Sequence, residues 1–160
     1  MVPTKITIIT ILTIIYCAGI PSDSYGVSST SPWWTHFTYQ FLHGSFIHLL
    51  SNAYALWFCL NKKNASFKNL LSIYLMSVLA SFIIPSSIPT VGSSGMIFSI
   101  IGINLISAPT KRNIIYTTII LITGFIIPHI AGGIHLTCFI LGFTVSAIYK
   151  NINRFKNDCC

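Results

Sequence analysis

The chain has 160 residues, of which 53% are hydrophobic and only 7% charged, and its mean hydropathy is +0.77. This balance excludes an ordinary soluble domain, in which roughly 25% of residues carry charge. The only acidic residues are Asp23 and Asp158, which excludes the carboxylate pair of a glycosidase and a carboxylate-caged metal site. Any chemistry must therefore come from Ser, His, Cys, Asn or Tyr side chains.

Apolar stretches separated by Pro, Gly and charged residues predict an all-α membrane protein with six helices. The expected helices form a single domain over residues 1–160 and cover about 6–20, 44–61, 69–85, 94–108, 113–128 and 134–149. Most of these segments are short for a bilayer, which is tolerated when neighbouring helices cover the polar backbone. We therefore expect a compact bundle of transmembrane helices.

The basic residues give an independent test of this topology. They precede the first segment, lie between the second and third and between the fourth and fifth, and follow the sixth: Lys5, Lys62, Lys63, Lys68, Lys111, Arg112, Lys150, Arg154 and Lys156. The other three loops, 21–43, 86–93 and 129–133, have none. Because cytoplasmic loops retain Lys and Arg, both termini are expected in the cytoplasm. The net charge of +7 then needs no nucleic-acid partner.

The first segment has an alternative interpretation as a signal peptide. It has the order of features typical of such a peptide: the basic Lys5, an apolar run and then Cys17-Ala18-Gly19. The bulky Tyr16 does not suit a lipoprotein cleavage site, and cleavage would leave five helices with an external N-terminus. An uncleaved segment fits the basic residues equally well and keeps an even number of helices.

The cysteines predict neither a metal site nor a disulfide framework. They are odd in number and lack the short Cys-x-x-Cys or Cys/His spacings of zinc and redox sites: Cys17, Cys59, Cys138, Cys159 and Cys160. The adjacent pair at the C-terminus does not form a CaaX box and is interpreted as a free tail. No cofactor or metal is expected.

Five histidines lie in the outer half of the expected bundle: His36, His43, His48, His129 and His135. Ionisable groups at that depth are costly, which makes them candidates for function, although each could instead form a hydrogen bond between helices. His48 and Asn52 are four residues apart and share one helix face. Two converging donors of this kind could stabilise an oxyanion, or could simply join two helices.

A second polar cluster, Gly92-Ser93-Ser94-Gly95, lies where a loop becomes the fourth helix. A hydroxyl there is close to free backbone N–H groups and to the positive end of the helix dipole, and both favour an alkoxide or oxyanion. Such a turn alone is more often only a loop. Gly95, Phe98 or Ser99, and Gly102 then form a stripe that would let another helix approach closely.

Depth in the membrane helps to choose a base for a serine nucleophile. Counted from the basic residue that ends each helix, Ser94 lies 17 residues up, His135 15 and His129 21. At about 1.5 Å per residue, His135 differs from Ser94 in depth by about 3 Å and His129 by about 6 Å. This favours His135. The same count puts His48 14 residues up but Asn52 only 10, too deep for the site unless that helix tilts.

With these residues in place, the chain resembles the rhomboid family of intramembrane serine proteases over residues 34–149. His43, His48 and Asn52 are similar to the H-x4-H-x3-N pattern of its second helix, and Gly92-Ser93-Ser94-Gly95 is similar to its G-x-S-G turn. Residues 134–143 are similar to its A-H-L-G-G-F-x-x-G-F run. The three motifs follow one another on the second, fourth and sixth expected helices.

The resemblance implies a Ser-His dyad, with Ser94 as the nucleophile and His135 as its base. His48, Asn52 and the backbone N–H of Ser94 would form the oxyanion hole. Gly92 and Gly95 would shape the nucleophile turn, and Phe98 would pack on the catalytic histidine. The implied fold is the rhomboid-like bundle of six transmembrane helices, with an active site that opens to the outside.

The sequence departs from the family pattern in several places. Thr35 follows Trp34 where the family usually has Arg, which puts the fixed shape of the first external loop in question. Phe98 stands in the place of a Tyr and can stack without the hydroxyl. Ile134 and Cys138 replace smaller residues, so the fourth and sixth helices are expected to pack less closely. A second alignment through His129-Ile-Ala-Gly leaves His129 open as the base.

The expected function is cleavage of transmembrane segments in single-span membrane protein substrates, within the lipid bilayer. A multi-pass protein of the bacterial plasma membrane, with its active site facing outside, is the simplest setting. One alternative is a catalytically inactive rhomboid-like protein that binds transmembrane helices. Another is a transporter or channel subunit that uses the histidines, which the lack of an intramembrane carboxylate disfavours.

Overall fold

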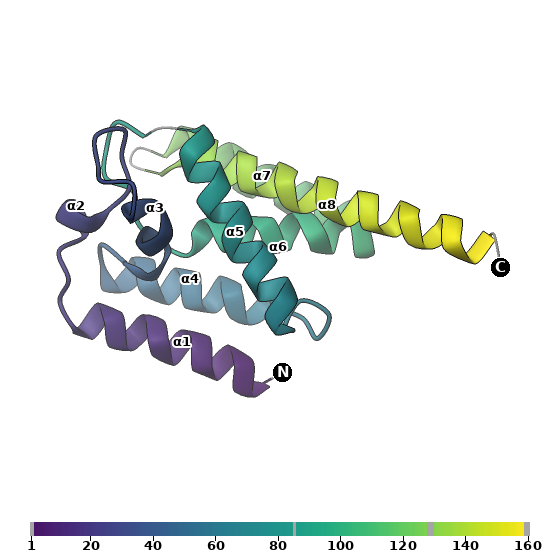
Figure 1. The fold of residues 1–160 in the computed structure, drawn as a ribbon, viewed down its shortest axis with the longest axis horizontal. Coiled ribbons are helices and arrows are strands. Elements are labelled where there is room, and N and C mark those ends of the chain that lie inside the picture. The colour runs from purple at the N-terminus through teal and green to yellow at the C-terminus, as the bar shows by residue number, and fades with distance from the viewer. Residues whose placement is uncertain (1, 85, 128–129, 159–160) are drawn as a thin grey trace.

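The computed structural model describes residues 2–84, 86–127 and 130–158, and Figure 1 shows their arrangement. The described residues form helices without a β-sheet, and the only strand-like pairing among them is an isolated bridge between Val27 and Thr90. This confirms the all-α prediction. The helices are α1 (Val2–Cys17), α2 (Ser22–Tyr25), α3 (Thr35–Thr38), the 3-10 helix η1 (Tyr39–Phe41), α4 (Phe46–Cys59), α5 (Phe67–Ile83), α6 (Ser94–Ser107), α7 (Lys111–Ile126) and α8 (Gly132–Asp158).

Three of the long helices begin at a residue whose hydroxyl accepts a hydrogen bond from the first turn. Ser45 accepts from the backbone N–H of His48 at the start of α4. Ser66 does the same for α5, and Thr110 for α7. Such caps satisfy backbone donors that the helix itself leaves unpaired. They explain why α5 and α7 begin two residues before the apolar segments predicted from the sequence.

The first and last helices differ from the predicted bounds. The apolar pattern places the first helix from residue 6, whereas α1 begins at Val2, because proline fits the first turn of a helix and Lys5 donates to the backbone carbonyl of Trp57. The sixth predicted helix ends at 149, but α8 continues to Asp158. No Gly or Pro occurs after Gly142 to end it.

Helix α6 lies at the centre of the bundle and packs directly on α8. A Cβ at Gly142 would overlap the carbonyl oxygen of Ser99, and a Cβ at Gly102 would overlap that of Phe139. The backbones of α6 and α8 are therefore in contact. The looser packing expected from Cys138 is wrong, because this fully buried side chain fits beside Gly95, which has no side chain of its own.

The exterior of the bundle is apolar. Large hydrophobic side chains are exposed on most of the long helices, among them Phe46, Ile47, Phe67, Ile126 and Phe155. Among the described residues one helix, Gly132–Asn157, is long and apolar enough to cross a membrane by length and composition, and four shorter helices are also apolar. An apolar exterior of this extent marks a surface that contacts lipid or protein.

The loop before α3 is held by hydrogen bonds, although Thr35 replaces the expected arginine. The Thr35 side chain is fully buried, and its hydroxyl donates to the carbonyl of Pro32 at 2.7 Å and lies 2.8 Å from the Ser31 hydroxyl. The bridge from Val27 to Thr90 joins this loop to the segment before α6. Local hydroxyls and backbone pairing thus hold the loop without an arginine.

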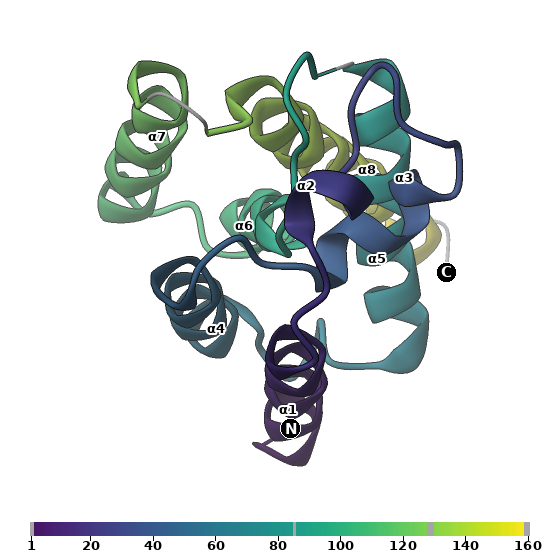
Figure 2. The same cartoon turned by 90° about the vertical axis from the view of Figure 1, so that its left-hand side faces the viewer.

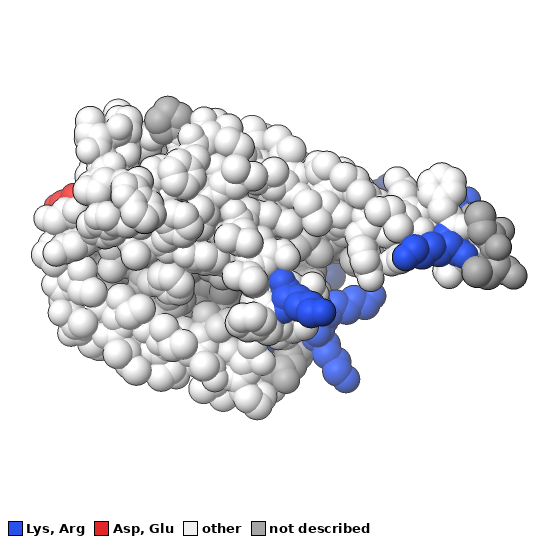
Figure 3. All heavy atoms as spheres, viewed as in Figure 1, with Lys and Arg blue, Asp and Glu red and all other residues white. Residues whose placement is uncertain are grey.

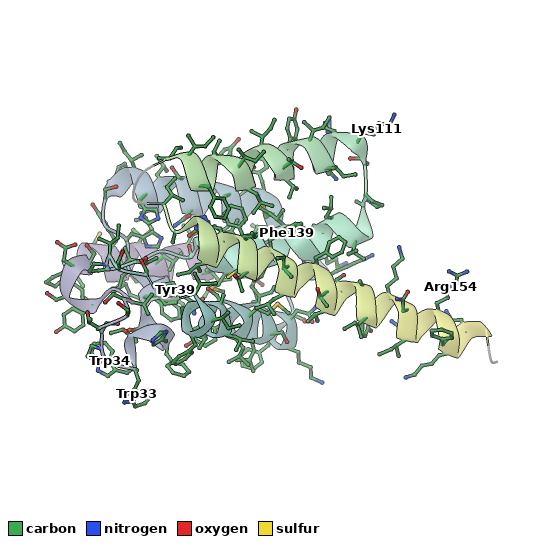
Figure 4. All side chains as sticks on the ribbon, turned by 90° about the horizontal axis from the view of Figure 1, so that it is seen from above. Trp33, Trp34, Tyr39, Lys111, Phe139 and Arg154 are labelled. Carbon is green, nitrogen blue, oxygen red and sulfur yellow. The ribbon has the colours of Figure 1, made fainter. Side chains whose placement is uncertain are left out.

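Two tryptophans and several basic side chains lie at opposite ends of the molecule. Trp33 and Trp34 lie at one end, and Lys111 and Arg154 lie toward the other (Figure 4). In the view of Figure 3 the lysine and arginine atoms also gather toward this second end, over the projecting part of α8 and the region where α5 begins. The bundle therefore has a polarity along its length.

Candidate active site

Ser94 and His135, 41 positions apart in the chain, meet because α6 and α8 are in contact. Ser94 is the first residue of α6, and its Oγ lies 2.8 Å from Nε2 of His135, near the start of α8. The imidazole is buried, and its Nδ1 has no hydrogen-bond partner among the described groups. A hydroxyl at this distance from an imidazole has the geometry of a nucleophile beside its base.

Phe98 orients the imidazole from the same helix that carries Ser94. It follows Ser94 by four positions, so both side chains lie on one face of α6. Its ring stacks on His135, with ring centroids 4.4 Å apart and an angle of 16° between the planes. One short stretch of α6 thus provides both a hydrogen-bonding and a stacking partner for His135.

His48 and Asn52 converge on Gly92, two positions before Ser94. Gly92 has a φ of +116°, and a Cβ there would lie 2.7 Å from Nε2 of His48 and 3.1 Å from Nδ2 of Asn52. A larger residue there would be strained by the backbone conformation and would displace the His48 side chain. Nδ2 of Asn52 is buried without a hydrogen-bond partner in the described structure. An unpaired buried donor is available to a ligand and costly to leave unused.

The residue count from the sequence places Asn52 deeper in the membrane than Ser94. The structure removes this discrepancy, because the basic residues used as reference points lie at different depths. The Asn104 side chain donates to the carbonyl of Cys59 at 2.7 Å, so these two residues are at the same depth. Asn104 follows Ser94 by ten positions, and Cys59 follows Asn52 by seven. The remaining offset of three residues is about 4.5 Å along a helix, which a side chain can bridge.

An open cavity of about 1180 Å³ begins at these residues and runs between α4 and α7, with α6 as its floor. Figure 2 shows α4 and α7 on either side of α6. His48, Asn52, Ser94, Phe98 and His135 line one end, and Asn104, Arg112 and Asn113 line the other. The wall between the two ends is mostly apolar, so the cavity suits an extended or helical apolar segment beside the Ser94 hydroxyl.

The sequence did not identify Tyr39 as part of the site's support. Tyr39 is fully buried, and its carbonyl accepts from the N–H of Gly92 at 3.0 Å. Its hydroxyl lies 2.7 Å from Oγ of Ser77 on α5 and can donate to the Ser77 carbonyl at 3.0 Å. Tyr39 therefore joins the turn before Ser94 to α5. The sequence carries only a weak signal of this role, since Ser77 is one of several polar residues within a mostly apolar helix.

The other histidines have different surroundings. His43 is buried against His48, with ring centroids 5.1 Å apart, and both of its nitrogens lack a partner among the described groups. Burial, and then the charge of His48, lowers the pKa of His43 to about 4. His36 bonds to Ser81 at 2.9 Å. His129 and the cysteines Cys159 and Cys160 lie outside the described residues.

No group of three or more His, Cys, Asp or Glu side chains is placed to hold a metal ion within residues 2–84, 86–127 and 130–158. The site pairs a hydroxyl with an imidazole, beside one amide donor and one further imidazole donor. This combination is suited to acyl transfer.

A comparison with known families agrees with this geometry. The family described as the Rhomboid domain matches residues 30–152, which is most of the chain and includes Ser94, His135, His48 and Asn52. No curated protein matches the sequence. The chain thus belongs to the rhomboid family and is an integral membrane protein.

Proposed function

We propose that this protein is an intramembrane serine endopeptidase that uses a Ser94–His135 dyad. The observation that carries the proposal is the 2.8 Å distance from Oγ of Ser94 to Nε2 of His135, beside a buried amide donor without a partner. Rhomboid proteins are in general serine proteases that act within the bilayer, and the match to this family supports the same class of reaction here.

In the first half of the proposed reaction, Oγ of Ser94 attacks the carbonyl carbon of the peptide bond while Nε2 of His135 takes the hydroxyl proton. The carbonyl oxygen becomes an oxyanion, which His48, Nδ2 of Asn52 and the N–H of Ser94 stabilise as donors. His135 then gives its proton to the leaving amine, the C–N bond breaks, and an acyl ester remains on Ser94.

In the second half, a water molecule attacks the ester with His135 as the base. The tetrahedral intermediate uses the same three donors, and its collapse releases the new carboxyl end while the proton returns to Oγ of Ser94. The dyad needs no acidic third member in this scheme. The stacked ring of Phe98, 4.4 Å away between centroids, holds the imidazole in position.

The proposed substrates are single-span membrane proteins. The cavity between α4 and α7 has mostly apolar walls and reaches Ser94 at one end, which suits a transmembrane segment approaching from the bilayer. A peptide bond inside a helix is shielded by its own hydrogen bonds, so the cleaved segment must unwind locally. Small or helix-breaking residues at the cleavage position would favour this.

The proposed topology has six membrane-spanning helices, α1 and α4 to α8, in a single domain over residues 1–160. The separation of Trp33 and Trp34 from Lys111 and Arg154 (Figure 4) supports cytoplasmic termini and an active site that faces outside. A bacterial plasma membrane is the simplest location. In this topology some helices are shorter than the bilayer is thick. The bilayer can thin locally around them, or polar side chains at their ends can reach the headgroups.

Co-expression with a tagged single-span substrate tests the proposal. The native chain should release a cleavage product, and Ser94→Ala and His135→Ala should abolish it. Ser93→Ala is the matched control, because Ser93 is the neighbouring buried serine and its hydroxyl has no partner among the described groups. It should keep most of the activity.

A second measurement separates catalysis from helix binding. A fluorophosphonate probe should label the purified native chain and Ser93→Ala, but not Ser94→Ala. Absence of both labelling and cleavage in a folded native chain that still binds its substrate would contradict the proposal and favour the inactive helix-binding alternative. Activity that needs His129 but survives His135→Ala would assign the base to His129.

A further inference from the structure

The end of α8 projects from the bundle as a helical arm, which we define as residues 148–158. Ser146 still contacts α6, where its hydroxyl donates to the Ile103 carbonyl at 3.4 Å. From Ile148 to Asn157 every side chain is exposed except that of Asn153, which is partly buried. Figures 1 and 3 show this arm extending beyond the other helices.

The arm has two chemically different faces. Ile148, Ile152 and Phe155 follow the i, i+4, i+7 spacing of one helix face and are all exposed. Lys150 lies on the opposite face, and Lys156 lies beside the apolar stripe. No acidic residue occurs in α8 before Asp158. The arm is therefore an amphipathic, basic helix.

Water alone does not favour the exposed apolar face of this arm. The arm continues α8, so its helix needs no nucleation of its own. Its apolar face exposes three large side chains without a covering partner in the described structure. A surface that accepts apolar groups on one side and positive charge on the other would stabilise it.

The length of α8 places the arm at such a surface. Its 27 residues span about 40 Å, whereas the hydrocarbon core of a bilayer is about 30 Å thick. Residues 132–147, which begin with the site and pack in the bundle, account for about 24 Å of this length. The arm then reaches the headgroup region, where lysine side chains extend to phosphate while their stems cover apolar surface.

We propose that the arm binds anionic phospholipid headgroups through Lys150 and Lys156, while the apolar stripe of Ile148, Ile152 and Phe155 runs from the ends of the acyl chains into the headgroup region. Charge complementarity selects this partner, because basic segments next to a transmembrane helix attract anionic lipids. A second copy of the chain would bring another arm of the same charge into contact. The inference does not depend on proteolytic activity.

Amide hydrogen exchange of the full chain in lipid nanodiscs tests this inference. Amides of the arm should exchange roughly tenfold more slowly in discs that contain phosphatidylglycerol than in discs of phosphatidylcholine alone. High salt should remove most of the difference, because mobile ions screen exposed charges. Equal exchange in the two lipids would overturn the proposal.

The double variant Lys150→Gln/Lys156→Gln should lose the slower exchange in phosphatidylglycerol. Lys62→Gln/Lys63→Gln is the matched control, since it removes two exposed charges between α4 and α5 and leaves the arm unchanged. It should keep the protection. If both variants lose the slower exchange equally, the cause is the net charge of the protein. If the protection rises with the number of copies per disc, the cause is contact between copies. Either result would refute lipid binding by the arm.

Discussion

The phenyl ring of Phe98 lies parallel to the imidazole of His135, 16° from coplanar and 4.4 Å away between centroids. Because Phe98 and Ser94 are one helical turn apart on α6, the orientation of this helix determines the position of His135 relative to the hydroxyl. No carboxylate accepts from its Nδ1 within the described structure. Stacking is thus the main restraint on the ring besides its hydrogen bond to Ser94.

Phe98→Ala should lower the turnover number for a model substrate by roughly 10- to 100-fold, because an imidazole that moves by about 1 Å is a poorer base. Phe98→Tyr should keep the stacking and most of the activity. Phe125→Ala, which truncates an exposed ring on α7, is the control and should be unaffected. A Phe98→Ala protein with full turnover would show that stacking does not position the base.

Gly142→Ala should destabilise the fold. The added methyl group would overlap the carbonyl oxygen of Ser99 and push α8 away from α6, and overpacking of this kind costs about 1–3 kcal/mol. Thermal unfolding in detergent should show a lower midpoint. Gly44→Ala is the matched control, since its nearest neighbour would lie at an ordinary 3.7 Å. Equal midpoints for the two variants would argue against backbone contact between these helices.

Tyr39→Phe should reduce the free energy of unfolding by about 1–3 kcal/mol, because it removes a buried hydroxyl that bonds to Ser77. The backbone bond from Gly92 to the Tyr39 carbonyl remains, so the turn should keep its shape and part of its activity. Tyr54→Phe, at an exposed position of α4, serves as the control. Unchanged stability of Tyr39→Phe in denaturant would contradict a structural role for the hydroxyl.

The stability of the protein should fall as the pH falls below about 6.5. Burial lowers the pKa of His43 from 6.5 to about 4, so in this window the unfolded chain binds a proton that the folded chain does not. Stability therefore rises with pH across the window and is fully present above it. Unfolding measured from about pH 7.5 to 4.5 should show this slope, and His43→Gln should make it shallower. An identical slope in the variant would assign the effect to other groups.

Much of the candidate site could be predicted from the sequence, because its chemistry is local. The spacing of His48 and Asn52, the Gly92–Gly95 turn and the polar residues of the last helix each indicate a role within one segment. The choice of His135 came from residue counts along helices, and the structure places this histidine beside Ser94. Its role as base stays a prediction.

Residue counts along different helices give comparable depths only if the basic residues they start from lie in one plane. The basic residues that follow α4 and α6 are not level, so the residue count gives Asn52 a depth that its position beside Gly92 corrects. Looser packing at Cys138 was expected from side-chain size alone, although Gly95 on the facing helix provides the space. The apolar pattern also predicts too early an end for α8, because a helix continues through polar residues until a residue such as Gly or Pro stops it.

The sequence by itself determined that the chain is helical, apolar and polarised in charge, because hydrophobic composition and basic residues act along the chain. Only the tertiary structure decided which groups meet. How closely α5, α6 and α8 approach one another determines three features of the site. These are the distance between Ser94 and His135, the stacking of Phe98 and the support from Tyr39. That approach depends on pairs of residues on facing helices, such as Gly142 and Ser99, which no single segment contains.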